Sequence, residues 1–275
     1  MPDFESLPTV LTLPGMEDVQ IARDIPYAEE NADLRYDLYR PHEHGHPLPA
    51  VILVSGNILG DEVLRTKHWA GFETAGRLLA ASGLAAITFD KHAWQDVAGL
   101  QRTSAEVEQL IDSVRGNPAE YGLDPEKLAL WVFSAGPPHG LRRALAQAPR
   151  YLRCLAVYYG VMDLRPQAAD AEEETALAEF SPITYLAAAA AIMPPLLLAR
   201  AGLDNPRLND TLDAFVAEAL RLNAPLELIN HSKGQHAFEL LDDVPLTRYI
   251  LLRTLEFFSQ YLWESESVVT FENRP

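Results

Sequence analysis

One short segment places a serine where its hydroxyl could act as a nucleophile. The hexapeptide WVFSAG at 131–136 ends an apolar run, and Pro137 fits the first turn of a helix because that position needs no N–H. Such a strand-to-helix turn lifts the Ser134 hydroxyl above a sheet edge and aims the Ala135 N–H at a forming oxyanion. The segment has the form G-x-S-x-G, with Val132 in place of the first glycine. The alternative is that Ser134 is an ordinary helix cap.

Two later segments supply the groups that would activate this serine. A serine needs a histidine to take its proton, and the histidine needs a carboxylate partner. The run LLLARAGLD ends in Asp204, which lies 204 − 134 = 70 residues after Ser134. The loop KGQHAF carries His236, another 236 − 204 = 32 residues on. The order serine, acid, histidine is the one found after a nucleophile turn of this kind.

Three other residues compete for these roles. His231 is the other histidine near the final loop, and it is otherwise a strand-end residue. Asp163 follows an apolar run and is the alternative acid; otherwise it is a cap or turn residue. Asp90 also ends an apolar run, and we expect it to support neighbouring loops, while His92 and Trp94 could line a pocket.

The elements that must position these residues alternate along the chain. A polar/apolar mixture at 19–26 and 34–40 predicts an antiparallel hairpin with one wet face. Continuous apolar runs predict buried parallel strands; they lie at 50–54, 85–89, 128–133, 155–159, 196–199 and 226–229. Helical spacing or capping predicts helices; these are at 69–81, 104–115, with Ser104 as the expected N-cap, 210–222 and 246–262. Each candidate residue then follows a different strand, at one edge of one sheet.

We expect a single domain over 1–275. No repeat and no low-complexity linker divides the chain. The stretch 164–187 is too long for a simple connection, and it contains an acidic group and two Pro-containing turns. It predicts either a small lid over the site or a solvated surface insertion.

The sequence resembles the α/β-hydrolase superfamily, in particular its dienelactone-hydrolase-like and prolyl-oligopeptidase-like esterase branch. The resemblance extends over about 19–262 and is most specific at FSAG, ARAGLD and GQHAF. It implies an α/β-hydrolase fold, with a mostly parallel central sheet of about eight strands and helices on both faces. It also implies that Ser134 is the nucleophile, His236 the general base and then acid, and Asp204 the orienting carboxylate.

The resemblance also implies where the oxyanion hole lies. One donor would be the Ala135 N–H, and the second would come from the loop after the first buried strand, here Val54-Ser55-Gly56-Asn57-Ile58. We expect the backbone N–H of Asn57 or Ile58. This loop departs from the usual His-Gly-Gly run, and Val132 departs from the glycine that lets helix and strand pack closely.

Composition excludes several classes of function. Lys+Arg is 22 and Asp+Glu is 39, a formal charge of −17, which argues against a nucleic-acid binder. The single cysteine, Cys154, excludes an intramolecular disulfide and a multi-Cys zinc site. The start of the sequence has no secretory pattern, and the longest apolar run, 186–199, is too short to span a bilayer. We therefore expect a cytoplasmic protein without a membrane partner.

The predicted function is hydrolysis of a carboxylic ester-like bond in a small molecule through an acyl-enzyme. Peptide, amide or thioester hydrolysis and acyl transfer stay open, as does a hydrolase-fold protein that only binds a small molecule. No metal or organic cofactor is implied. His42, His44 and His46 alternate in one loop and could hold a metal, but we expect solvated side chains. The apolar final helix fits a homodimer and, equally, the monomer's own core.

Overall fold

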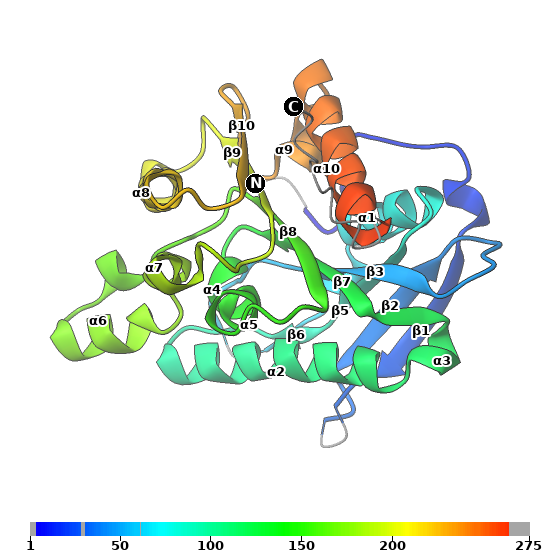
Figure 1. Ribbon diagram of the computed structural model, residues 1–275, viewed down its shortest axis with the longest axis horizontal. Coiled ribbons are helices and arrows are strands. Elements are labelled where there is room, and N and C mark those ends of the chain that lie inside the picture. Colours follow the sequence, from blue (N-terminus) through cyan, green and yellow to red (C-terminus); the bar gives the residue numbers. More distant parts are fainter. Residues whose placement is uncertain (1–3, 29–30, 61, 264–275) are drawn as a thin grey trace, which may run out of the picture.

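The computed structural model describes residues 4–28, 31–60 and 62–263, and its centre is one twisted sheet (Figure 1). Within the described residues this sheet has eight strands in the order β1-β2-β5-β3-β7-β8-β9-β10. They are β1 (Gln20–Pro26), β2 (Arg35–Arg40), β3 (Leu48–Val54), β5 (Ala85–Phe89), β7 (Leu123–Phe133), β8 (Leu152–Tyr158), β9 (Leu196–Ala201) and β10 (Leu226–His231). A separate ribbon pairs β4 (Val63–Leu64) with β6 (Lys91–His92).

The strand directions match the expected pattern. The hairpin partners β1 and β2 are antiparallel, and β2 is also antiparallel to β5. From β5 through β3, β7, β8, β9 and β10, every neighbouring pair is parallel. The carboxyl ends of these six strands therefore meet at one edge of the sheet, where ligands bind in folds of this kind.

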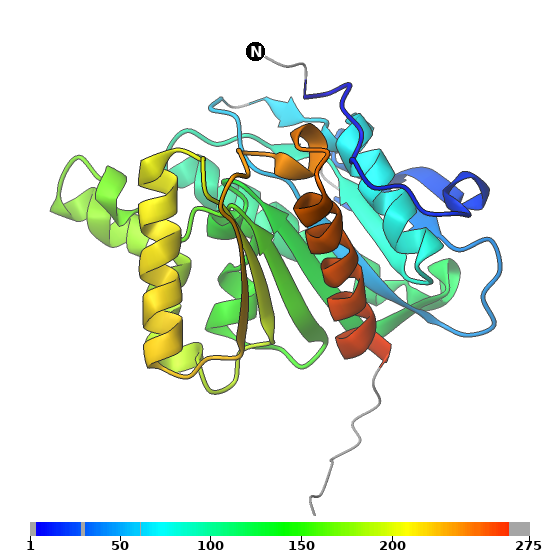
Figure 2. The same cartoon turned by 90° about the horizontal axis from the view of Figure 1, so that it is seen from above.

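Helices cover both faces of the sheet (Figures 1 and 2). One face is packed by α1 and α10, and the other by α2, α5, α7 and α8. The helices are α1 (Ala70–Ala81), α2 (Val97–Gly116), α3 (Pro118–Tyr121), α4 (Pro137–Gly140), α5 (Arg142–Ala146), α6 (Ala171–Ala178), α7 (Leu186–Ala189), α8 (Pro206–Arg221), α9 (Phe238–Leu241) and α10 (Pro245–Trp263). No helix in the described part of the chain is both long enough and apolar enough to cross a membrane.

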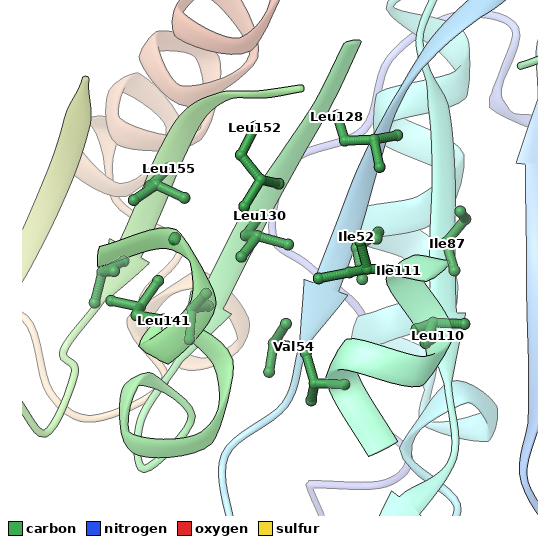
Figure 3. Packing of buried hydrophobic residues seen from close by; sticks show 14 of the residues in the cluster. Ile52, Val54, Ile87, Leu110, Ile111, Leu128, Leu130, Leu141, Leu152 and Leu155 are labelled. Atoms are coloured by element: carbon green, nitrogen blue, oxygen red, sulfur yellow. The ribbon is translucent and has the colours of Figure 1, made fainter. Parts of the chain in front are cut away.

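Successive side chains of a buried strand point to opposite faces of the sheet and so contribute to two hydrophobic cores. In β3, Ile52 and Val54 point to the α2 side, where Figure 3 shows them beside Leu110 and Ile111. Their neighbours Val51 and Leu53 belong to the opposite core, under α1 and α10. All four β3 side chains are at most 1% exposed. Burying one aliphatic side chain contributes about 1.5–3 kcal/mol, so this central strand is a rigid base for the loops that follow it.

One helix begins earlier than the sequence pattern predicted. We expected Ser104 to cap a helix over 104–115, but α2 starts at Val97, and Ser104 lies buried inside it. The true cap is Asp96, whose Oδ1 accepts the Gly99 N–H at 2.8 Å. The prediction was wrong because Asp96, about two turns upstream of the more obvious serine, already accepts one of the free N–H groups of the first turn.

The 164–187 segment folds into short helices. It contains the 3-10 turns Arg165–Gln167 and Pro182–Tyr185 as well as α6 and the start of α7. Leu177 and Phe180 from this segment pack with Trp94 and Leu100 in a small apolar cluster of their own.

Candidate active site

Ser134 sits in a strained turn between β7 and α4. Its φ is +56°, a left-handed value that a residue with a side chain rarely adopts. Hydrogen bonds fix the turn on both sides: Ser134 N donates to Tyr158 O at 3.1 Å, and Val161 N donates to Ser134 O at 2.9 Å. The neighbouring strand β8 and the loop after it therefore hold the conformation that lifts this hydroxyl off the sheet.

Two glycines, Gly136 just before α4 and Gly140 at its end, make room for Val132. A Cβ on Gly136 would lie 2.8 Å from Val132 Cγ1 and 2.7 Å from the Phe133 carbonyl oxygen. A Cβ on Gly140, one turn later, would lie 3.5 Å from Val132 Cγ1 and 3.0 Å from Val54 Cγ1. These two glycines, which have no side chain, let the helix approach the strand closely even though the strand carries a valine at position 132.

The loops after β9 and β10 carry Asp204 and His236 and are bonded to each other. Leu203 N donates to Gly234 O at 2.8 Å, and Gly202 N donates to His231 O at 2.9 Å. The Gln235 backbone N–H, next to the histidine, donates to Asp242 Oδ2 at 3.0 Å. The loops that follow two adjacent parallel strands thus hold the Asp204 carboxylate and the His236 imidazole in fixed positions relative to each other.

The three predicted residues form a continuous hydrogen-bonded relay. Ser134 Oγ lies 2.9 Å from His236 Nε2, and His236 Nδ1 lies 2.7 Å from Asp204 Oδ2. The Asp204 side chain is 5% exposed, whereas that of His236 is 38% exposed. The carboxylate is therefore shielded, and the imidazole faces both the serine and open space.

The competing residues lie in other interactions. His231 is buried, and its Nε2 is 3.1 Å from Thr247 Oγ1. Asp163 makes two short contacts with the Arg165 guanidinium, at 2.7 and 2.9 Å, and this arginine lowers the pKa of Asp163 although partial burial opposes the effect. Neither side chain takes part in the relay.

The loop after β3 is held at three successive residues. The Ser55 carbonyl oxygen is 3.2 Å from His139 Nε2, and the Gly56 carbonyl accepts from Lys91 Nζ at 2.9 Å. The Asn57 side chain exchanges two hydrogen bonds with the Trp94 backbone, at 2.7 and 2.9 Å. Burial lowers the pKa of His139 well below its ordinary value, so this imidazole is neutral. The loop is preorganised rather than mobile.

This loop lies against the serine turn. A Cβ on Gly56 would be 2.8 Å from Ser134 Cβ and 3.4 Å from the Ala135 nitrogen. The loop that carries the predicted oxyanion donors Asn57 and Ile58 therefore packs, at Gly56, against the turn that carries the third predicted donor, Ala135. Lys91 and His139, which hold the loop, were not singled out as site residues from the sequence, because nothing in their local pattern shows what they contact.

A buried tyrosine–glutamate pair stands behind the imidazole. The Tyr159 ring centroid lies 4.5 Å from that of His236, and the Tyr159 hydroxyl donates to Glu239 Oε1. Burial raises the pKa of Glu239 to about 7. Tyr159 has a φ of +40°, and its N–H donates to Ala199 O at 2.8 Å. This pair was also missed at the level of sequence, where Glu239 reads as a polar residue at the start of a helix.

A cavity of about 380 Å³ opens beside Ser134 and His236. The serine turn, the loop after β3, α1, α9 and the first residues of the described chain form its walls. Its lining includes Gly56, Asn57 and Ile58 but no residue of the described 164–187 segment. His92 and Trp94, which could have lined a pocket, are also not among the lining residues.

No cluster of three or more His, Cys, Asp or Glu side chains that could hold a metal occurs within the described ranges. His42, His44 and His46 are exposed, and His44 Nδ1 lies 3.3 Å from the His46 carbonyl oxygen.

Asp90 is fully buried beside Arg65, whose Nη1 is 3.7 Å from Asp90 Oδ2. Burial raises the pKa of Asp90 to about 7.

Comparison with solved structures identifies the architecture. An esterase from the planctomycete Thermogutta terrifontis with bound propionate matches 92% of this chain and 98% of its own, with a TM-score of 0.70 and 18% identity. This chain has the α/β-hydrolase fold. A truncated carbohydrate esterase from gut microbiota matches 89% of this chain and 97% of its own, with a TM-score of 0.73 and 15% identity. The Thermogutta esterase phosphorylated by paraoxon aligns similarly, with a TM-score of 0.68 and 18% identity over 92% of this chain and 98% of its own. No protein-family model matches the sequence, and no curated protein matches it.

Proposed function

We propose that this protein is a serine hydrolase that cleaves a carboxylic ester-like bond of a small molecule. The observation that carries the proposal is the relay Ser134–His236–Asp204, with separations of 2.9 and 2.7 Å, whose serine and histidine line a cavity. These are the separations that a nucleophile, a general base and an orienting carboxylate need.

The chemistry follows from the geometry. Ser134 Oγ attacks the ester carbonyl while His236 Nε2 takes the hydroxyl proton, and Asp204 stabilises the imidazolium through Nδ1–H. The oxyanion accepts hydrogen bonds from the Ala135 N–H and from the N–H of Asn57 or Ile58. His236 then protonates the leaving alcohol, which departs. Water attacks the acyl-enzyme with His236 as base, releases the acid and restores the serine.

The cavity and the structural neighbours favour esters. The neighbours are described as esterases, and one of them holds propionate while another form has been phosphorylated by paraoxon. Peptidase, amidase, thioesterase or acyltransferase activity on the same residues is the second candidate. The dienelactone-hydrolase-like and prolyl-oligopeptidase-like branch is part of the proposal and rests on FSAG, ARAGLD and GQHAF.

A binding protein without catalysis is the competing class. The two sequence departures that favoured it were Val132 and the short loop at 54–58. Val132 faces the glycines of α4, and the loop is fixed by His139 and Lys91 beside Ser134. Both arrangements are compatible with turnover, so the enzyme is the better-supported reading.

The test combines covalent labelling with turnover. A fluorophosphonate probe should label the wild-type protein at Ser134, and short-chain 4-nitrophenyl esters should be hydrolysed at neutral pH. Ser134→Ala should lose the label and at least about three orders of magnitude of kcat/KM. Ser113→Ala, a half-exposed serine on α2, serves as the matched control and should keep both. Neither labelling nor turnover in a folded wild-type protein would favour the binding protein.

A further inference from the structure

Part of the cavity wall is formed by the start of the described chain. We call residues 4–13 the N-terminal strap. Phe4 and Thr9 from this strap line the cavity, as Ser134 does. Figure 2 shows the strap running beside α1, well away from α6 and α7.

Hydrogen bonds attach the strap to two helices. The Glu5 carbonyl accepts from Ala70 N at 2.8 Å, and Thr9 N donates to Thr74 Oγ1 at 2.9 Å, both at α1. Val10 N donates to the Glu239 carbonyl at 2.9 Å, at α9. The strap is therefore tied to the helix that follows His236, and its position is set relative to the reacting groups.

The strap and α1 are closely packed where Leu7 passes Gly71. A Cβ on Gly71, in the first turn of α1, would lie 3.2 Å from the Leu7 carbonyl oxygen and 2.8 Å from Leu240 Cδ2. The backbone of the strap thus passes so close to α1 that a side chain at Gly71 would crowd it. Phe4 itself is half-buried against the core beneath α1 and α10. Its side chain thus contacts the core and also forms part of the cavity wall.

The lining shared by the strap and the sheet is apolar and largely aromatic. Its rings come from the strap, from the α1 region and from β7, with one more after β8; they are Phe4, Trp69, Phe72, Trp131, Phe133 and Tyr159. No lysine or arginine occurs among the described lining residues, and the one carboxylate there is that of the buried Glu239, whose Oε1 accepts a hydrogen bond from the Tyr159 hydroxyl. An apolar group is stabilised by such walls, whereas a carboxylate on the substrate finds no lysine or arginine among them.

We propose that the N-terminal strap is the size filter of this site, that Phe4 sets the largest group admitted, and that the substrates are uncharged esters with a bulky apolar group in the cavity. The inference rests on the proposed ester hydrolysis. It assigns to residues 4–13 the role of covering the site that the sequence suggested for 164–187.

The test uses the full chain and two matched ester series. The first varies the acyl group as 4-nitrophenyl acetate, butyrate, octanoate and phenylacetate; the second varies the alcohol as ethyl, butyl and benzyl acetate. Phe4→Ala should raise the ratio of kcat/KM for the largest ester to that for the smallest by about tenfold, and Phe4→Trp should lower it. The series in which the ratio moves shows whether the acyl or the alcohol group occupies the cavity.

A variant in the alternative lid is the control. Leu177→Ala, in α6, should leave this ratio within about twofold, because Leu177 packs with Trp94 and Leu100 and is not among the residues that line the cavity. A shift with Leu177→Ala and none with either Phe4 variant, in both series, would overturn the assignment. The half-ester of glutaric acid with 4-nitrophenol should be hydrolysed at least about tenfold less efficiently than the pentanoate. Equal efficiency would overturn the substrate class.

The proposal for the strap and the proposal of ester hydrolysis can be tested separately. Fluorophosphonate labelling of Ser134 tests the hydrolase independently of the size of the ester group. Thermal shifts of Ser134→Ala with and without Phe4→Ala, measured with butyl and benzyl acetate, give the size preference without turnover. If Phe4→Ala does not fold, Phe4→Trp and Phe4→Leu still change the size of the wall in opposite directions.

Discussion

The Nζ of Lys91 donates a 2.9 Å hydrogen bond to the carbonyl oxygen of Gly56. In a trans peptide the carbonyl of one residue and the N–H of the next point in opposite directions. Lys91, fully buried, therefore fixes the direction of the Asn57 N–H, one of the two proposed second donors to the oxyanion. Burial lowers the pKa of Lys91 to about 7, and a neutral amine still has hydrogens to donate.

Lys91→Met should therefore lower kcat more than it changes KM. Removing the donor frees the Gly56–Asn57 peptide, and a misplacement of about 1 Å at a catalytic group costs up to about 10²-fold in rate. Steady-state kinetics with 4-nitrophenyl butyrate gives the two constants separately. Affinity for a boronic acid that mimics the tetrahedral intermediate should fall in parallel with kcat/KM. An increase in KM with kcat intact would assign Lys91 to ground-state binding instead.

Gly56→Ala should block the site. The new Cβ would lie 2.8 Å from Ser134 Cβ and 3.4 Å from the Ala135 nitrogen, so either the loop or the serine turn must move. We expect kcat/KM to fall by about 10²–10³-fold, the usual result of losing one oxyanion donor. Gly45→Ala is the control, because a Cβ there meets nothing within 4 Å. Equal activity of the two variants would show that the Gly56 loop is not part of the site.

The parts of the site that follow chain order could be predicted from the sequence, and the parts that depend on contact could not. Ser134, Asp204 and His236 each follow a strand of a parallel sheet, and parallel strands bring their carboxyl ends together. By contrast, the compensation of Val132 by Gly136 is made across a helix–strand contact and has no local signature.

The start of α2 and the role of Lys91 also depend on tertiary contacts that the sequence does not show. The start of α2 at Val97 was missed because several residues in one stretch could cap a helix, and only tertiary packing selects Asp96. Lys91 was missed because a lone lysine in a sequence is normally exposed, and its role depends on full burial.

Asp204→Asn should cost about 10³–10⁴-fold in kcat. An amide in place of Asp204 Oδ2 would leave His236 Nδ1–H without its charged partner and disfavour the tautomer that accepts the serine proton. Asp163→Asn is the matched control, since Asp163 pairs with Arg165 rather than with the relay. Single-turnover measurements with a 4-nitrophenyl ester give the acylation rate of each variant directly. A larger loss for Asp163→Asn than for Asp204→Asn would exchange the two assignments.

Glu239 should make the protein less stable as pH rises from about 4.5 to about 7. Its pKa is raised from an ordinary value of 4.5 to about 7, mainly by burial, so within this window the folded state keeps a proton that the unfolded state releases. The contribution of Glu239 to the free energy of unfolding therefore falls with pH there and levels off above pH 7. Glu239→Gln keeps an acceptor for the Tyr159 hydroxyl but cannot ionise, so it should flatten this part of the curve. Asp90, whose pKa is also raised to about 7 by burial, should preserve a residual slope. Urea unfolding of both proteins at pH 5, 6, 7 and 8 measures the difference, and identical slopes would show that Glu239 titrates normally in the folded protein.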